Sequence, residues 1–371
     1  MKKSYILLAL MAVGICAACT HDGETVVNMG QEVITPTNTN MPPELRLTYG
    51  HGAAGTRAGS SVQSTLFEAD EQIDVFMRDA TDGCVTYPTL PLTYTSNGNG
   101  TLSYDDSSNR LFWPKLLHAF EIYGVYPHGS VSSSTKITEG VFDPFTYNTD
   151  YSFTVRADQT AVADYKASDL MIGFPSDPTP DVAPCILNQD GDEGTVELDF
   201  KHRLTKILVT LPIDDKILTG IGKIVADDVA YSGTEDTKYA RITLSNINRK
   251  ISFKVYHATP GNDLGIAVAA DEGPATVVSR GNDIAFIVPP QTIPAEPGPF
   301  ITIDLIGESE EVTDTYTYSL AEPLTLEPQK VYTYNIKLDK PTVSVTVNSI
   351  TPWDIIDIIP GVSTGTAGLV Q

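Results

Sequence analysis

Basic residues, cysteine and tryptophan are scarce in this sequence. Its 371 residues include 24 Lys+Arg against 47 Asp+Glu, which gives a formal net charge of −23, and only 4 Cys and 2 Trp. A surface this acidic repels phosphate backbones, so we expect no nucleic-acid partner. Cys16 and Cys19 lie near the N-terminus, which leaves Cys84 and Cys185 for the rest of the chain. Whether these two form a disulfide is left open by the sequence.

Long apolar runs are also absent. No segment reaches the roughly 18 consecutive apolar residues that a membrane-spanning helix needs. The apolar run at 6–15 follows two lysines, and two alanines stand directly before Cys19. This order resembles a bacterial lipoprotein signal, with a signal peptide over residues 1–18 and lipidation at Cys19. It predicts a protein anchored by lipid at the outer-membrane surface, with simple secretion as the alternative.

Residues 19–43 have no sustained apolar periodicity. They end in a stretch of prolines and small polar residues at 36–43, which disfavours both helix and sheet. We interpret 19–43 as a tether between the anchor and the folded part.

From Leu45 onward, short alternating segments are separated by turn residues. The segments 92–95 and 101–104 flank Asn97-Gly98-Asn99-Gly100, which is a strong hairpin signal. The run 284–288 is wholly apolar and suits a strand covered on both faces. No long stripe with a 3.6-residue period is present, so we expect an all-β fold built from β-sandwiches.

The segment from Val196 to Leu211 is the most informative strand. Its apolar residues alternate with polar ones until Lys206, where the apolar set moves by one position, and this predicts a β-bulge near Thr205. An acidic, glycine-bearing loop precedes it. We therefore expect one β-sandwich domain over 44–194 and a second over 195–371, with a boundary uncertain by about ten residues.

Motifs of catalysis and metal binding are missing. The sequence has no H-E-x-x-H and no G-x-x-x-x-G-K-[ST], and its six histidines lack metal-ligand spacing. His202 falls on an apolar face and is best interpreted as a hydrogen-bonded core histidine. We expect no enzyme activity, no cofactor and no metal. The pairs Tyr316/Tyr318 and Tyr332/Tyr334 fit cross-strand neighbours on one face, with stacking on sugars as the alternative.

Several segments together resemble the fimbrillin (Mfa-like) family, the pilin-type lipoproteins of type V pili. The similarity extends over roughly residues 45–358, and its order and spacing are more specific than any single motif. The segments are Thr56–Ala58, Phe67–Phe76, Phe112–Pro114, Phe120–Pro127, Tyr165–Ile172, Phe200–Ile207, Lys330–Ile336 and Pro352–Asp354.

The resemblance implies two transthyretin-like β-sandwich domains and a polymerising surface protein. In the family, a protease removes an N-terminal strand, and a strand of a neighbouring subunit then completes the sheet. Here the strand would be 44–49 and the cut would fall between Arg57 and Ala58, with Arg46 as a rival site. The donor strand would come from 342–347 or 355–371.

The expected partners are other fimbrial subunits, the outer membrane, and a host or bacterial surface ligand. The alternative function is a monomeric, glycan-binding surface lipoprotein.

Overall fold

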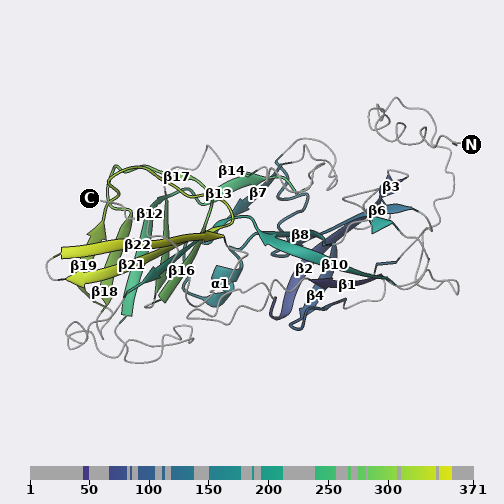
Figure 1. Cartoon of the computed structure of the whole chain (residues 1–371), viewed down its shortest axis with the longest axis horizontal. Helices are drawn as coiled ribbons and strands as arrows, with labels where there is room; N and C mark the ends of the chain where they lie inside the picture. The colour runs from purple at the N-terminus through teal and green to yellow at the C-terminus, as the bar shows by residue number, and fades with distance from the viewer. Residues whose placement is uncertain are drawn as a thin grey trace, which may run out of the picture. The chain divides into compact units, whose positions relative to one another are not determined.

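In the computed structural model, the regular secondary structure of the described residues is almost entirely β-strand (Figure 1). The part that the structure describes contains one helix, α1 (Val162–Lys166), of five residues. The all-β expectation is therefore confirmed. The described residues are 45–49, 67–81, 84–85, 91–104, 111–112, 118–137, 150–176, 186–187, 194–211, 239–255, 266–268, 275–280, 283–306, 311–339 and 342–352.

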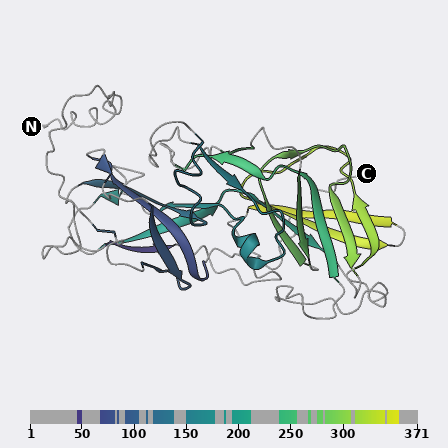
Figure 2. The same ribbon diagram turned by 180° about the vertical axis from the view of Figure 1, so that it is seen from behind.

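A nine-stranded sheet contains most of the N-terminal half of the described chain; its purple and blue strands are seen from behind in Figure 2. The main strand order is β1-β10-β8-β6-β2-β4-β5, while β3 pairs with β2 and β9 with β6. Every pairing is antiparallel except that of β1 with β10. The strands are β1 (Leu45–Tyr49), β2 (Ala69–Asp79), β3 (Cys84–Val85), β4 (Leu92–Asn97), β5 (Leu102–Ser103), β6 (Ala119–Tyr126), β8 (Met171–Pro175), β9 (Ile186–Leu187) and β10 (Gly194–His202).

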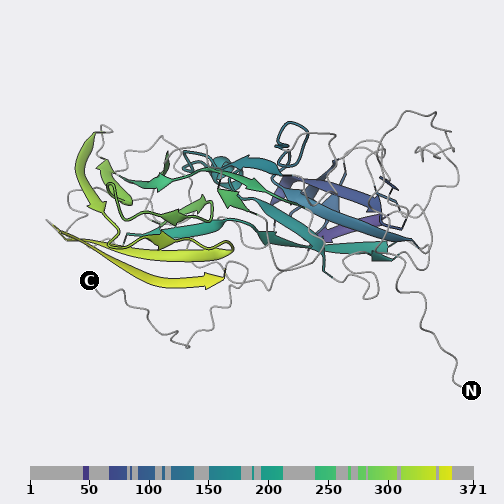
Figure 3. The same ribbon diagram turned by 90° about the horizontal axis from the view of Figure 1, so that it is seen from above.

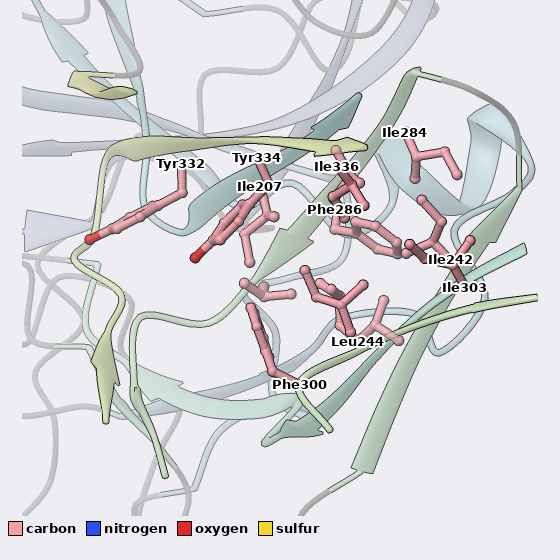
Figure 4. Packing of buried hydrophobic residues seen from close by; sticks show 14 of the residues in the cluster. Ile207, Ile242, Leu244, Ile284, Phe286, Phe300, Ile303, Tyr332, Tyr334 and Ile336 are labelled. Carbon is pink, nitrogen blue, oxygen red and sulfur yellow. The ribbon is translucent and has the colours of Figure 1, made fainter. Parts of the chain in front are cut away.

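Two four-stranded sheets form the C-terminal half, and Figure 3 shows them as separate layers. The first has the order β16-β11-β21-β22, with β11 (Thr205–Thr210), β16 (Asp283–Val288), β21 (Lys330–Asp339) and β22 (Thr342–Pro352). The second has the order β15-β12-β18-β19, with β12 (Tyr239–Ile247), β15 (Ala275–Arg280), β18 (Ile301–Ile306) and β19 (Val312–Tyr318). Apolar side chains from both sheets meet in one core, drawn in Figure 4.

Two smaller sheets complete the described fold. One joins β7 (Tyr151–Thr154) to β13 (Lys250–Phe253) and β14 (Ala267–Val268), and the other pairs β17 (Thr292–Ile293) with β20 (Leu324–Thr325). A second core lies where β7 meets β13, and it includes residues from β2 and β6 as well as from β16. The N-terminal and C-terminal halves therefore share buried apolar contacts, and residues 40–371 form one compact unit.

Two local predictions are confirmed. Strands β4 and β5 form an antiparallel hairpin, and Gly98 and Gly100 in its turn have φ of +72° and +92°, a region that favours glycine. Strand β16 is buried on both faces. Phe286 belongs to the core between the two four-stranded sheets, whereas its neighbour Ile287 belongs to the second core.

The expected single strand over 196–211 is wrong. The alternation holds as far as His202, but the chain then leaves the nine-stranded sheet, and β11 begins in another sheet at Thr205. The apolar positions shift because each strand buries its own face in a different sheet, and no bulge is needed at Thr205. Residues 194–202 belong to the nine-stranded sheet, and the expected division of the chain at 194–195 remains a prediction.

Candidate functional site

The N-terminal strand β1 lies where the two ends of the nine-stranded sheet meet. On one side it pairs in parallel with β10, with Leu45 opposite Gly194 and Tyr49 opposite Leu198. On the other side it meets the β4–β5 hairpin through a bridge between Thr48 and Thr101. We call the place that β1 occupies between β10 and this hairpin the β1 slot.

Side chains of β1 alternate between buried and exposed. Leu47 and Tyr49 are each 2% exposed, whereas Arg46 is exposed and Thr48 is half-buried. The alternation expected for 44–49 is confirmed at these four positions. Full burial of a large apolar side chain contributes about 1.5–3 kcal/mol. Leu47 and Tyr49 therefore supply most of the hydrophobic stabilisation that side chains 46–49 contribute to the slot.

Tyr49 also makes the most specific polar contacts in the β1 slot. Its hydroxyl donates a hydrogen bond to the carbonyl oxygen of Phe67 at 3.1 Å and lies 2.9 Å from Oγ of Ser96. Its backbone N–H donates to the carbonyl oxygen of Gly100 at 3.0 Å. The hairpin therefore contacts both the backbone and the phenol of the last residue of β1.

The Ser96 hydroxyl is itself held in place. The backbone N–H of Gly98 donates to Oγ of Ser96 at 3.0 Å, so the hairpin turn fixes the oxygen that faces Tyr49. Ser96 is 2% exposed. A buried hydroxyl that loses its partner is destabilising, because water cannot replace the lost hydrogen bond.

Phe67 is the aromatic centre beside the slot. Its ring packs edge-on against Tyr49 with a centroid distance of 5.2 Å and against Phe200 of β10 at 4.9 Å. It also contacts the ring of Tyr126 at 5.0 Å. The aromatic side chain of β1 therefore connects, through Phe67, to β6 and β10.

The residues expected to be modified or cleaved, Cys19, Arg57 and Ala58, lie outside the described residues. They remain predictions without a structural position. Sequence reasoning did not identify Ser96, Phe67 or Gly100 as site residues. The Asn-Gly-Asn-Gly turn signalled the hairpin, but no local pattern shows which strand a hairpin will contact.

His202 is a hydrogen-bonded core histidine, as expected. Its Nδ1 lies 2.9 Å from Oδ1 of Asp169, and both residues are buried. Lys206 is also buried, and burial lowers its pKa to about 8, against the opposing attraction of the Asp169 carboxylate. These groups lie outside the β1 slot.

The tyrosine pairs are part of the protein core. Tyr316, Tyr332 and Tyr334 are 8%, 2% and 1% exposed, and Tyr318 packs against the same cluster. Figure 4 shows Tyr332 and Tyr334 directed to the same side of β21. Their interpretation as same-face neighbours is confirmed, and the rings of Tyr316, Tyr332 and Tyr334 are too deeply buried to stack on a sugar.

Cys84 lies in β3, opposite Asp79 of β2. Cys185 lies outside the described residues, so the structure does not place it relative to Cys84. A core of this size needs no disulfide for its stability, and we expect two free thiols.

Within the described ranges, no group of His, Cys, Asp or Glu is arranged to hold a metal ion. The same ranges contain no helix that is long and apolar enough to cross a membrane.

The arrangement of sheets is similar to that of solved structures. The chain covers 99% of a Bacteroides uniformis structure described as a cell adhesion protein, with 84% of its own length aligned, a TM-score of 0.51 and 18% identity. It covers 100% of a fimbrial protein structure from Bacteroides vulgatus, with 85% of its own length aligned, a TM-score of 0.42 and 13% identity. No curated protein sequence matches the chain.

The chain belongs to the fimbrillin-like family, whose model matches residues 56–353. The family is one of fimbrial proteins, and membership implies a location at the cell surface.

Proposed function

We propose that this protein is a structural subunit or adhesin of a type V fimbrium and assembles by strand exchange after proteolytic removal of β1. The observation that carries the proposal is the β1 slot. One short N-terminal strand fills a place between β10 and the β4–β5 hairpin, and it does so by parallel pairing at the end of the strand order.

Loss of β1 would convert the slot into an acceptor. The backbone groups of 194–198 that pair with β1 would lose their partners, and the pocket filled by Leu47 and Tyr49 would open. An unpaired sheet edge with an adjacent apolar groove favours the addition of another extended strand. In such an addition, backbone hydrogen bonds supply affinity and alternate side chains fill the pockets.

The pairing of β1 with β10 argues against the rival cleavage site, Arg46. Arg46 lies within β1, where its residue pairs with Thr195, so a protease could cut there only after local opening of the strand. A cut between Arg57 and Ala58 would leave β1 whole and separate it from β2.

The structure also narrows the source of the donor strand. The expected donor 342–347 is the first part of β22, which pairs with β21 from Asp339↔Thr342 to Lys330↔Pro352. Donation of 342–347 would break this pairing. Donation of the tail 355–371, or of a strand from another type of subunit, would leave the pairing of β21 with β22 intact.

The proposal also includes lipidation of Cys19, a tether over 19–43 and a transthyretin-like topology in both halves.

The Cys19→Ala substitution removes the proposed site of lipidation, and without acyl chains the protein has no stable membrane anchor. We therefore expect the variant to move from the membrane fraction to soluble export. Unchanged membrane association would rule out the lipid anchor.

Assembly can be tested with an arginine-specific protease and electron microscopy. We expect the soluble full chain to lose its N-terminal segment and form filaments, and we expect Arg57→Ala protein to resist both changes. The matched control Arg46→Ala should be processed and polymerise like wild type. Stable monomers after complete removal of β1 would contradict the proposal.

The alternative function, a monomeric glycan-binding lipoprotein, is no longer supported by exposed tyrosines. It was based on the tyrosine pairs at 316/318 and 332/334, and these belong to the core cluster.

A further inference from the structure

We infer that the β1 slot selects strands that carry tyrosine at the position of Tyr49. The inference rests on the proposed strand exchange and identifies the chemistry of the preferred partner. It starts from an asymmetry within β1: the pocket of Leu47 is apolar, whereas the pocket of Tyr49 ends in two polar atoms that contact the phenol. These atoms are the carbonyl oxygen of Phe67 and Oγ of Ser96.

Contacts that do not involve β1 hold both oxygens. Ser96 is the buried penultimate residue of β4, and its Oγ accepts from the Gly98 N–H and lies 3.4 Å from the Phe67 carbonyl oxygen. The Gly100 carbonyl, two residues further along the turn, accepts the N–H of Tyr49 at 3.0 Å. The hairpin turn therefore recognises the residue at this position twice, through its backbone and through its side chain.

A strand without a phenol would be at a disadvantage in this pocket. Phenylalanine would fill the apolar part and contact the Phe67 ring, but the Phe67 carbonyl would keep only the longer, 3.4 Å hydrogen bond from the Ser96 hydroxyl. The loss of both hydrogen bonds of the phenol in a buried pocket corresponds to a loss of about tenfold in affinity. Smaller residues would lose the aromatic contact with Phe67 as well.

The C-terminal part of this chain cannot supply the phenol. The sequence contains no tyrosine after Tyr334, so neither 342–347 nor 355–371 of a second copy can place one beside Ser96. The tail of a second copy can therefore fill the slot only as a weaker occupant, as in filaments of this chain alone. The preferred occupant is an extended segment of a different fimbrial subunit, with an apolar residue two positions before a tyrosine, as in Leu47-Thr48-Tyr49.

Dissociation of β1 from a nicked protein tests the inference within the full chain. A specific protease site placed in 51–60 allows the chain to be cut while β1 stays bound, and the loss of the N-terminal fragment is followed after dilution. We expect Tyr49→Phe and Ser96→Ala each to speed this loss about tenfold, and we expect the double variant to be little faster than either. The matched control Thr48→Val removes a hydroxyl from the half-buried position of the same strand and should leave the rate within about twofold. Equal rates for wild type and Tyr49→Phe would overturn the inference.

A peptide competition uses only wild-type receptor and does not depend on the folding of a variant. Protein that has lost β1 is titrated with a labelled peptide of residues 41–52, with its Tyr49→Phe form and with a peptide of residues 355–371. We expect the tyrosine peptide to bind about tenfold more tightly than the phenylalanine form and more tightly than the tail. Tail binding that equals or exceeds tyrosine-peptide binding would overturn the inference but would support strand exchange between copies. Tyrosine-dependent binding without filaments under any condition would support the inference and contradict the proposed assembly.

Discussion

In the nine-stranded sheet, one aromatic ring packs directly against the backbone of two glycines. This contact gives a quantitative test of the fold. Gly124 of β6, Gly173 of β8 and Phe200 of β10 are neighbours across three adjacent strands. A Cβ atom added to Gly173 would lie 2.8 Å from Cγ, Cδ2 and Cε2 of Phe200, and one added to Gly124 would lie 2.5 Å from its Cζ. Because the two glycines have no side chain, the Phe200 ring can occupy the space next to their backbone.

The magnitudes follow from this geometry. Phe→Ala in a core costs about 3–5 kcal/mol, and since Phe200 is partly exposed we expect Phe200→Ala to lower the free energy of unfolding by about 3 kcal/mol. We expect Gly173→Ala alone to lower the free energy of unfolding by about 1–3 kcal/mol through overpacking. The clash includes Cγ of Phe200, and a rotation of the ring about its axis does not move this atom. In the Phe200→Ala background the clash is gone, so Gly173→Ala should cost close to nothing.

Urea unfolding of the four proteins in this double-mutant cycle measures the coupling. We expect a coupling free energy of about 1–3 kcal/mol between positions 173 and 200. Lys201→Ala is the control, since its side chain is 50% exposed on the opposite face of β10, and it should change stability by no more than about 0.5 kcal/mol. Additive effects, or a loss at Lys201 equal to that at Phe200, would refute the packing described here.

Three further outcomes are expected. Burial lowers the pKa of Lys206 to about 8, so between pH 8 and 10 the folded protein loses a proton that the unfolded chain keeps; the free energy of unfolding should rise over this range in wild type and stay flatter in Lys206→Met. Gln159→Leu should cost about 2–4 kcal/mol in urea unfolding, because the Gln159 amide bonds both the N–H and the carbonyl of Ile287, at 2.9 and 2.8 Å. Protein that lacks residues 1–19 should expose two titratable thiols, Cys84 and Cys185, on unfolding without reductant, and a thiol count near zero would show that they pair.

Short-range patterns in the sequence were sufficient to predict individual strands. The hairpin at 97–100, the doubly covered strand 284–288 and the alternation from Val196 to His202 all depend on neighbours within a few residues. The exchange of sheets at 203–204 was misread as a bulge, because both produce the same shift in the apolar positions.

Pairing between distant strands could not be predicted in the same way. Nothing in the 45–49 segment indicates that it would lie parallel to β10 or that Tyr49 would meet Ser96. Both contacts depend on which strands become neighbours in the sheet, and no local sequence pattern specifies that. The need for glycine at position 124 could not be predicted either, because its reason is the ring of Phe200, which lies far away in the sequence.

The central claim is that this chain enters a surface fimbrium after it loses β1. The most direct test is to determine the N-terminal residue of the chain recovered from purified surface filaments. The account predicts that the chain is present in the filaments and begins at Ala58, after removal of the segment that contains β1. Filaments that lack this chain, or in which it still retains residues 45–49, would contradict it.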